Sequence, residues 1–511
     1  MNEKKYYDIG IVLGPILGIE SETKYTICIL IDNKVISKNE VIKLYSKSGE
    51  YYPILTELKN FSFLRFEIEV IPEDWKRIII DYCFKIGEIL IGNKYNIFTF
   101  EFEVPSKNAV PNIVFASCNG SHKKYPNNIH PDNWKGWNKI NEVKPDLIIL
   151  NGDQIYADEI WNKLKNIKQY TKHLQKQINV NDLDKIDEFY LQLYIDSWSY
   201  KDMAICLSKY PTIMNWDDHD IIDGYGSYDK LIQDSTLLKA IFQSAKKYYL
   251  LFQLRGKDNI SLIKPGSLSS IFQWRNYIFI LPDTRSNRTT CQIIPTEELN
   301  DYKSKLKPFY NSSKDVIFVI PVPLAHRDYN GAVEKIISRF TYFRTRNNPF
   351  KGLIKGSLED DAIDHWDHNN HTKEHQHFLE WMFDQAEKIN ANYMLIISGD
   401  VHSAGAAKIT YKKNNNQNKY STQLISSPLV NNPITSIQSF AVSLSSRNRT
   451  MYDKFDLELI QFGTFKKIYI NQRNFIKIYK PRGKGLNSAI YYEINNEWQI
   501  EPEYRNLNLF N

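Results

Sequence analysis

The chain of 511 residues is long enough for two or three domains, and 42% of its residues are hydrophobic, 24% charged and 14% aromatic. This composition excludes a mainly disordered, collagen-like or coiled-coil protein. Its 65 Lys and Arg residues exceed its 59 Asp and Glu residues by only six, without a dense basic block. That balance disfavours a dedicated nucleic-acid or membrane-surface binder and remains compatible with a small anionic substrate.

Cysteine usage and hydropathy bear on the compartment. The five cysteines include no CxxC pair, so a disulfide framework is not expected. No apolar run reaches the roughly 18 residues that a membrane helix needs. The apolar run over residues 9–19 is interrupted by Gly10, Gly14 and Pro15 and lacks a small-residue cleavage site, which favours a strand and turn over a signal peptide. We therefore expect a cytoplasmic protein, or one exported without a recognisable amino-terminal signal.

Residues 1–107 contain short runs that are rich in β-branched and aromatic residues. The runs over 63–70 and 95–104 alternate apolar and polar side chains, and turns separate the runs. This pattern predicts a small antiparallel β-sandwich domain. The segment 105–111 begins and ends with proline and is interpreted as a linker.

The pattern changes in residues 108–465, where buried-strand runs alternate with helical stretches such as 184–207 and 231–254. This order is typical of α/β proteins. Because ligands bind at the carboxyl ends of strands in open α/β sheets, the polar residues that end these runs are expected to form one site. Residues 466–511 return to β-rich runs and are predicted to pack on this domain as an extension. The six apolar runs are 113–116, 146–150, 212–214, 277–281, 316–320 and 393–397.

Three acidic motifs follow such runs. Asp153 and Tyr156 are three residues apart, so one helical turn would place both side-chain oxygens on one side. Residues 217–220 place three carboxylates around a histidine, and these repel one another unless cations or the imidazole offset them. Asp400 and His402 would share a face in an extended chain. Carboxylate oxygens and imidazole nitrogens bind divalent and trivalent metals, whereas the simpler alternatives are a helix-capping aspartate and an acidic surface turn.

On these residues the chain resembles the PhoD-type alkaline phosphatases (alkaline phosphatase D family) of the metallophosphatase superfamily. The resemblance covers about residues 110–410. It implies an α/β (α+β) two-sheet sandwich flanked by helices, preceded by a small all-β sandwich, with a polynuclear metal site for phosphoric ester hydrolysis. The matching segments are 115–118, 152–156, 216–220, 283–285, 364–367 and 398–402.

The resemblance also implies metal-binding roles. Asp153 would bridge two metals, and Fe3+ and Ca2+ are the implied cofactors, with other divalent metals left open. The implied ligands of the iron ion are Cys118, Tyr156 and His402. The further implied metal ligands are Asp218, Asp400 and, for calcium, Asp223. For Cys118 the alternative is a small buried hydrophobic residue.

Catalytic and substrate-binding roles are predicted for further residues. His219 would donate a proton to the leaving group or orient it. Arg285 could clamp phosphate oxygens with its planar guanidinium, although an arginine after a strand is often an ordinary surface residue. The predicted substrate-binding residues are Asn119, Asp217, Arg285 and Trp366.

The predicted function is metal-dependent hydrolysis of a small phosphate monoester or diester by a metal-activated water. A catalytically degenerate binding protein on the same scaffold is the alternative from another class. A nuclease is a further alternative, but basic residues are not clustered with aromatic residues in one stripe, so no nucleic-acid partner is predicted. The substrate's identity and the oligomeric state stay open.

Five of the eleven histidines lie in residues 365–377. One interpretation is a substrate lid or an accessory metal site, because His368, His371 and His375 would share a helical face. The favoured interpretation is a helix that begins after Asn370 and turns His377 and the following residues toward the core. His326 is a further candidate for the rim of the site.

Overall fold

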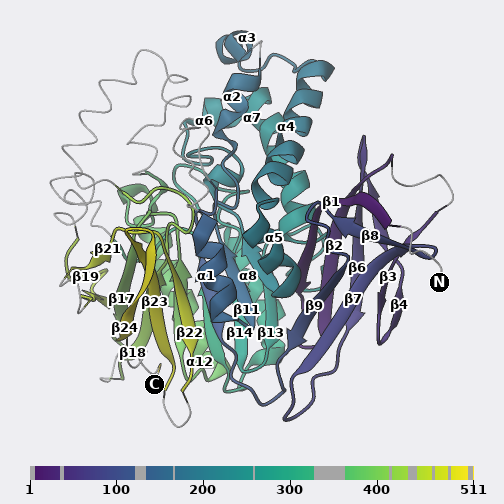
Figure 1. Ribbon diagram of the computed structural model, residues 1–511. Coiled ribbons are helices and arrows are strands. Elements are labelled where there is room, and N and C mark those ends of the chain that lie inside the picture. The colour runs from purple at the N-terminus through teal and green to yellow at the C-terminus, as the bar shows by residue number, and fades with distance from the viewer. Residues whose placement is uncertain are drawn as a thin grey trace.

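The computed structural model describes residues 6–34, 40–120, 134–164, 167–256, 259–326, 363–413, 417–434, 446–462, 467–481, 485–504 and 510. Among these residues, two β-sheets lie face to face and helices cover the outer face of each (Figure 1). The amino-terminal strands, drawn in purple, lie at one side of the molecule. No helix in the described ranges is both long and apolar enough to cross a membrane.

The first sheet is centred on three short parallel strands. Their residues are all buried, as expected for parallel strands covered on both faces. The antiparallel strand β22 pairs with β10 and connects the carboxyl-terminal strands to this sheet, in the order β24-β23-β22-β10-β11-β12. The parallel strands are β10 (Ile113–Ala116), β11 (Leu147–Asn151) and β12 (Thr212–Asn215). The carboxyl-terminal strands are β22 (Asn474–Tyr479), β23 (Asn487–Ile494) and β24 (Glu497–Tyr504).

The second sheet has the order β13-β14-β15-β16-β18-β17-β20-β19, and β21 also pairs with β17. Strands β14, β15, β16 and β18 are parallel to their neighbours in that series. The strands are β13 (Ser270–Trp274), β14 (Tyr277–Leu281), β15 (Asp315–Val319), β16 (Met394–Ser398), β17 (Ala404–Tyr411), β18 (Lys419–Ile425), β19 (Arg449–Met451), β20 (Phe455–Leu459) and β21 (Tyr469–Ile470).

Helices pack on the sheets because successive strand residues point to opposite faces. Leu147 of β11 and Ile317 of β15 belong to the core between the sheets. Their neighbours Ile148 and Val316 belong to two other clusters, which also contain buried residues of α4 and of α12 respectively. The helices are α1 (Lys135–Val143), α2 (Ile160–Lys163), α3 (Ile167–Lys172), α4 (Val180–Trp198), α5 (Lys201–Lys209), α6 (Lys230–Gln233), α7 (Thr236–Tyr248), α8 (Thr296–Leu306) and α12 (Thr372–Ile389).

The amino-terminal strands are hydrogen-bonded to the first sheet. Strand β1 covers the apolar run for which the sequence predicts a strand, and its Gly18 pairs in parallel with Thr212 of β12. A buried ion pair between Arg65 and Glu20 (2.8 Å) lies beside this junction. The domain boundary expected near residues 105–111 stays a prediction. The strands are β1 (Tyr6–Ile19), β2 (Lys24–Asp32), β3 (Ile42–Ser46), β4 (Gly49–Tyr51), β5 (Ile54–Glu57), β6 (Phe61–Glu69), β7 (Ile78–Ile86), β8 (Ile89–Asn93) and β9 (Thr99–Val104).

The histidine-rich segment forms the start of α12. The helix begins at Thr372, close to the predicted position. Phe378 and Leu379 are buried as expected, whereas His377 is exposed and His371 and His375 are the histidines that face the core. The ring of His375 packs against Tyr452, with a distance of 2.8 Å from Nδ1 to the phenolic oxygen. These contacts favour the structural interpretation of the segment.

His375 is expected to make the protein sensitive to acid. Burial, helped by the nearby Arg449 cation, lowers the pKa of His375 to about 3. The unfolded chain would bind a proton at this residue near pH 6.5, so the folded state loses stability as the pH falls from about 6.5 toward 3. Between pH 6 and 4, the free energy of unfolding of the wild type should fall by about 1.4 kcal/mol per pH unit more than that of His375→Gln. Urea unfolding at several pH values measures both. His377→Gln, on the same helix, is the control. If the free energy of unfolding depends on pH equally in His375→Gln and in the wild type, the prediction is wrong.

Candidate metal centre

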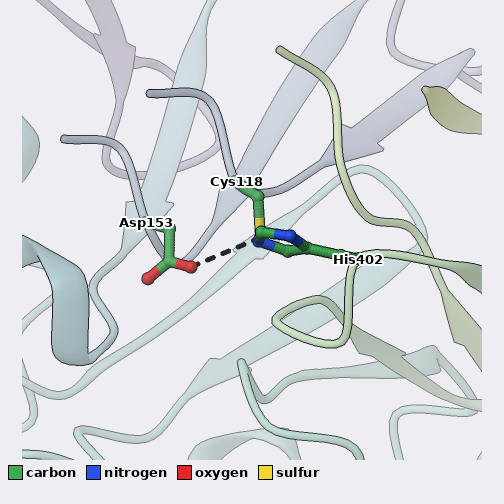
Figure 2. Close-up of side chains that lie close together, drawn as sticks. All are labelled: Cys118, Asp153 and His402. Carbon is green, nitrogen blue, oxygen red and sulfur yellow. Dashed lines mark hydrogen bonds between the residues drawn. The ribbon is translucent and has the colours of Figure 1, made fainter. Parts of the chain in front are cut away.

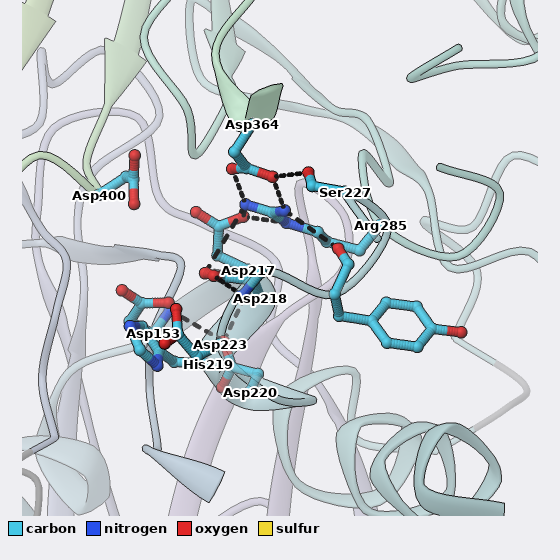
Figure 3. Close-up of polar contacts among 12 residues, drawn as sticks. Asp153, Asp217, Asp218, His219, Asp220, Asp223, Ser227, Arg285, Asp364 and Asp400 are labelled. Carbon is cyan, nitrogen blue, oxygen red and sulfur yellow. Dashed lines mark hydrogen bonds and ion pairs between the residues drawn. The ribbon is translucent and has the colours of Figure 1, made fainter. Parts of the chain in front are cut away.

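Four candidate ligands occupy equivalent positions after four strands. Cys118, Asp153, Asp217 and Asp400 each lie two residues beyond the last residue of β10, β11, β12 and β16. Because these strand ends meet at one edge of the two facing sheets, the side chains are brought together (Figures 2 and 3). The convergence predicted from the strand ends is therefore present in the structure.

The loops that carry these residues have an uncommon backbone conformation. The φ angles of Cys118, Asp153, Asp400 and His402 are 53°, 58°, 63° and 51°, in the left-handed region. Such conformations cost about 1 kcal/mol or more per residue and cluster at functional sites. They turn four side chains from three loops toward a common centre.

The glycines that precede the two aspartates allow these loops to approach closely. Gly152 has φ 91°, and a Cβ atom there would lie 2.8 Å from the Cβ atom of Asp217. A Cβ atom at Gly399 would lie 2.4 Å from that of Ser117. Any larger residue at either position would push two loops of the site apart.

Two buried asparagines at the ends of β11 and β12 form hydrogen bonds between the two sheets, next to these loops. The side-chain amide of Asn151 donates to the carbonyl oxygens of Ile320 (3.2 Å) and Ile397 (2.9 Å). The amide of Asn215 donates to Pro282, at 2.9 Å, and to a second carbonyl of the facing sheet. Both residues end strands of the first sheet, so their bonds hold the strand ends of the two sheets in register.

The first group of ligand atoms includes a thiol, a carboxylate and an imidazole. Those of Cys118, Asp153 and His402 lie within 4.8 Å of one another. The sulfur atom of Cys118 is 3.3 Å from Oδ2 of Asp153 and 3.0 Å from the hydroxyl of Ser427. The hydroxyl of Tyr156 lies 3.3 Å from the same Asp153 oxygen and 3.2 Å from Nε2 of His402. Figure 2 shows three of these side chains pointing toward one another.

Two further groups extend this one. Asp153, Asp218 and His219 form the second group, and Asp217, Asp218 and Asp400 form the third, each with ligand atoms within 4.8 Å of one another. Asp153 is shared by the first two groups and Asp218 by the last two. The three groups therefore form one continuous cluster. Figure 3 shows the side chains of the second and third groups.

The charges of this cluster are not balanced by the described residues alone. Burial raises the pKa of Asp153 well above its usual range, and His219 only partly opposes this. Burial likewise raises the pKa of Asp217 to about 7. Oδ1 of Asp153 and Oδ2 of Asp217 are buried and accept no hydrogen bond within the described ranges. Bound cations would satisfy these oxygens, so the donor set fits a metal centre.

Cys118 and Tyr156 have the chemistry that a trivalent ion requires. Burial is the main cause that raises the pKa of both groups, and the neighbouring Asp153 adds to it. Neither group would ionise at neutral pH without a nearby cation. A metal at this position would therefore bind thiolate and phenolate and release their protons.

Asp158, which the sequence analysis overlooked, positions His219. Its Oδ2 lies 2.9 Å from Nδ1 of His219, and its Oδ1 accepts a hydrogen bond from the backbone N–H of Asp223 at 2.8 Å. Burial alone would lower the pKa of His219, but Asp158 and Asp218 raise it well above its usual value. Asp158 therefore holds the imidazole through its Nδ1 atom. The only sequence signal was an acid two residues after Tyr156.

Replacing Asp158 is expected to disturb this arrangement. Asp158→Asn keeps the side chain's size but removes the charge that holds the imidazolium. We expect kcat for phosphate ester hydrolysis to fall about 10- to 100-fold with a smaller change in KM, and the alkaline limb of the pH profile to move to lower pH. Asp456→Asn, which changes a half-buried carboxylate on β20 that pairs with Lys412, is the control. An unchanged pH profile would argue against the positioning role.

Asp220 is a second residue that was not singled out as a site residue. Its carboxylate accepts hydrogen bonds from the backbone N–H groups of Asp153, Gln154 and Asp217, at 2.9, 3.1 and 2.9 Å. It lies in the short helix η3 (Asp218–Asp220). Asp220 thus ties the loop after β11 to the loop after β12 and fixes the spacing of their two aspartates.

Arg285 lies behind the carboxylates. Its guanidinium is fully buried and forms a bidentate pair with Asp364 at 2.5 and 2.7 Å, while Nε donates to Asp217. Burial opposes ionisation of Asp364, but Arg285 and Arg288 hold the pKa of that carboxyl well below its usual range. These contacts favour a positioning role for Arg285 over the phosphate clamp predicted from the sequence.

The other predicted substrate-binding residues are also buried against protein. Oδ1 of Asn119 accepts a hydrogen bond from Nε1 of Trp137 at 2.7 Å. Trp366 stacks on Phe378 with ring centres 4.8 Å apart. Asp223 belongs to none of the three groups of ligand atoms found among the described residues. Roles in substrate or calcium binding for these residues remain predictions. His326 is buried beside His365 and Tyr469, with ring centres 6.0 and 4.9 Å apart.

Two solved structures with a similar fold are described as phosphatases. A structure of PhoD has a TM-score of 0.56 at 12% identity and matches 98% of this chain and 93% of its own. A purple acid phosphatase from yellow lupin (Lupinus luteus) seeds has a TM-score of 0.50 at 10% identity, over 96% of this chain and 73% of its own. These matches confirm the predicted fold class.

The sequence comparisons identify the family. An uncharacterized protein of Saccharomyces cerevisiae is 26% identical over 435 residues, which are 73% of this chain and 60% of the yeast protein. The chain thus spans about 60% of the length of that curated relative. The family model described as "PhoD related phosphatase" matches residues 142–351 and 348–455. The chain belongs to the PhoD-related phosphatases.

Proposed function

We propose that the protein is a phosphoric ester hydrolase that acts on small phosphate monoesters or diesters at a polynuclear metal centre around Asp153. The observation that carries this proposal is the single cluster formed by the three groups of ligand atoms. Thiol, phenol and imidazole donors suit Fe3+, and the carboxylates of Asp217, Asp218 and Asp400 suit Ca2+. Asp223 is proposed as a further calcium ligand on the resemblance alone.

The residues of the chain divide the work as follows. Bound cations would supply an activated water and neutralise the charge of the phosphate. His219, held through Nδ1 by Asp158, would donate a proton from Nε2 to the leaving alcohol. Arg285 would keep Asp217 ionised and hold its carboxylate in position through their buried ion pair. Asp220 would keep the loops that carry Asp153 and Asp217 at a constant distance.

Metal removal and reconstitution test this proposal. Purified protein is assayed on a panel of phosphate monoesters and diesters before and after chelation, and again after addition of iron and calcium. We expect chelation to lower turnover at least about 100-fold and reconstitution to restore it, while circular dichroism shows that the fold persists. Metal-loaded protein that hydrolyses no ester of the panel would instead favour a binding protein. Full activity in protein shown to be metal-free by elemental analysis would contradict the proposal.

A further inference from the structure

Tyr156 connects the candidate metal centre with a neighbouring cavity of about 680 Å³. The hydroxyl of Tyr156 contacts Asp153 and His402, and the same side chain lines the cavity. The other walls come from α2, α4 and the turn between β5 and β6. Cavities of this size between parts of a protein commonly bind organic ligands.

The lining combines aromatic rings with an excess of negative charge. Five carboxylates and three lysines line the cavity, which gives the lining a net charge of −2. The aromatic residues are Phe61, Trp134, Tyr156, Phe189, Tyr200 and Tyr248. The carboxylates are Glu159, Asp184, Asp187, Glu188 and Asp196. The lysines are Lys59, Lys163 and Lys185.

The walls of the cavity are held in place by specific contacts. The rings of Trp134 and Tyr200 stack with centres 3.9 Å apart at an angle of 12°. Lys59, in the turn between β5 and β6, pairs with Asp184 (3.5 Å) and Glu188 (3.3 Å) of α4. The amino-terminal strands therefore form one wall of a cavity whose other wall lies beside the metal ligands.

We infer that this cavity binds the alcohol part of the phosphate ester and selects a bulky, uncharged aromatic alcohol over a small or an anionic one. The inference rests on the proposed function, because a phosphate held beside Tyr156 would direct its alcohol toward this cavity. Aromatic walls favour burial of a flat apolar group. The net negative lining repels a carboxylate, and it also disfavours a polyanionic substrate such as a nucleic acid.

A matched pair of esters tests the preference for size. Naphthylethyl phosphate and ethyl phosphate have leaving alcohols of similar basicity, so their difference in kcat/KM reports mainly binding. We expect the wild type to prefer the naphthylethyl ester at least about tenfold. Gln192 lies on the exposed side of α4, lines the cavity and donates to Asp196 at 2.7 Å. Gln192→Trp should fill the cavity and lower this preference at least fivefold, whereas Lys239→Trp on α7, outside the lining, should keep the wild-type ratio.

A third ester, with a carboxylate on the naphthalene ring, tests the preference for charge. We expect its kcat/KM to be at least about fivefold below that of the neutral naphthyl ester at low salt and to approach it at high salt. Asp196→Asn should narrow the difference, because it removes one carboxylate of the lining. Equal or better use of the anionic ester by the wild type would overturn this part of the inference.

The outcomes separate the inference from the proposed function. If ethyl phosphate is hydrolysed without any preference for the naphthyl ester, or if Gln192→Trp keeps the preference, the cavity does not bind the alcohol while the hydrolase assignment stands. If neither ester is hydrolysed, the hydrolase assignment fails. Calorimetric titration with naphthylethanol then tests whether the cavity binds the alcohol. Binding to the wild type that is lost in Gln192→Trp supports the site, and no binding to the wild type overturns it.

Discussion

Asp153→Asn is expected to lower the turnover of phosphate esters at least about 10³-fold, since metal ions contribute several kcal/mol of transition-state stabilisation. Asp153 is the residue that the thiol-containing group and the His219 group share. Its Oδ1 is buried and has no hydrogen-bond donor within the described ranges, as expected of an atom that binds a cation. An asparagine of the same shape offers one oxygen instead of two and carries no charge, so it cannot bridge two metals.

The same substitution separates activity from folding. Asp153 is surrounded by other carboxylates, and burial disfavours its charged form. In the absence of metal, the unfolding temperature of Asp153→Asn should therefore be equal to or higher than that of the wild type, because the substitution removes a buried charge. Elemental analysis should show a reduced metal content. Near-normal turnover in a folded Asp153→Asn protein would contradict the bridging role.

The position of the site could be predicted from the sequence because it depends on strand order alone. Short apolar runs that end in Gly-Asp predict parallel strands whose carboxyl ends meet. Asp153 and Asp400 were placed together on this basis, and both lie in the observed cluster. A continuous apolar run carries this information because each strand is buried over its whole length.

Contacts between distant loops could not be predicted in the same way. Asp158 reaches His219 across 61 positions, and Arg285 reaches Asp364 across 79. The turn of η3 that directs Asp220 back onto the neighbouring loop leaves no periodic signal. From the sequence, Arg285 is therefore interpreted as a phosphate clamp or as an ordinary surface residue, whereas Asp217 and Asp364 hold it in the interior. The residue types in the sequence indicate the chemistry of the site, whereas the packing of the folded chain determines which side chains face it.

A visible charge-transfer band is expected once iron is bound, because Cys118 and Tyr156 are electron-rich donors beside Asp153. The sulfur and the phenolic oxygen both lie 3.3 Å from Oδ2 of Asp153, so one ion can contact all three residues. Asp and His ligands alone would suit many divalent metals, whereas thiolate and phenolate offset the charge of a trivalent ion. Tyr156→Phe and Cys118→Ser should each shift or bleach the band.

The spectrum is measured on iron-loaded protein of known metal content, together with the protons released on loading. Each substitution should remove about one released proton, because burial keeps both groups protonated before the metal binds. Cys291→Ser and Tyr310→Phe lie outside the cluster and are the matched controls. If the spectrum of Tyr156→Phe and of Cys118→Ser equals that of the wild type at full iron occupancy, neither residue is an iron ligand. That result would leave a carboxylate and histidine centre, which would still support phosphate ester hydrolysis with divalent metals.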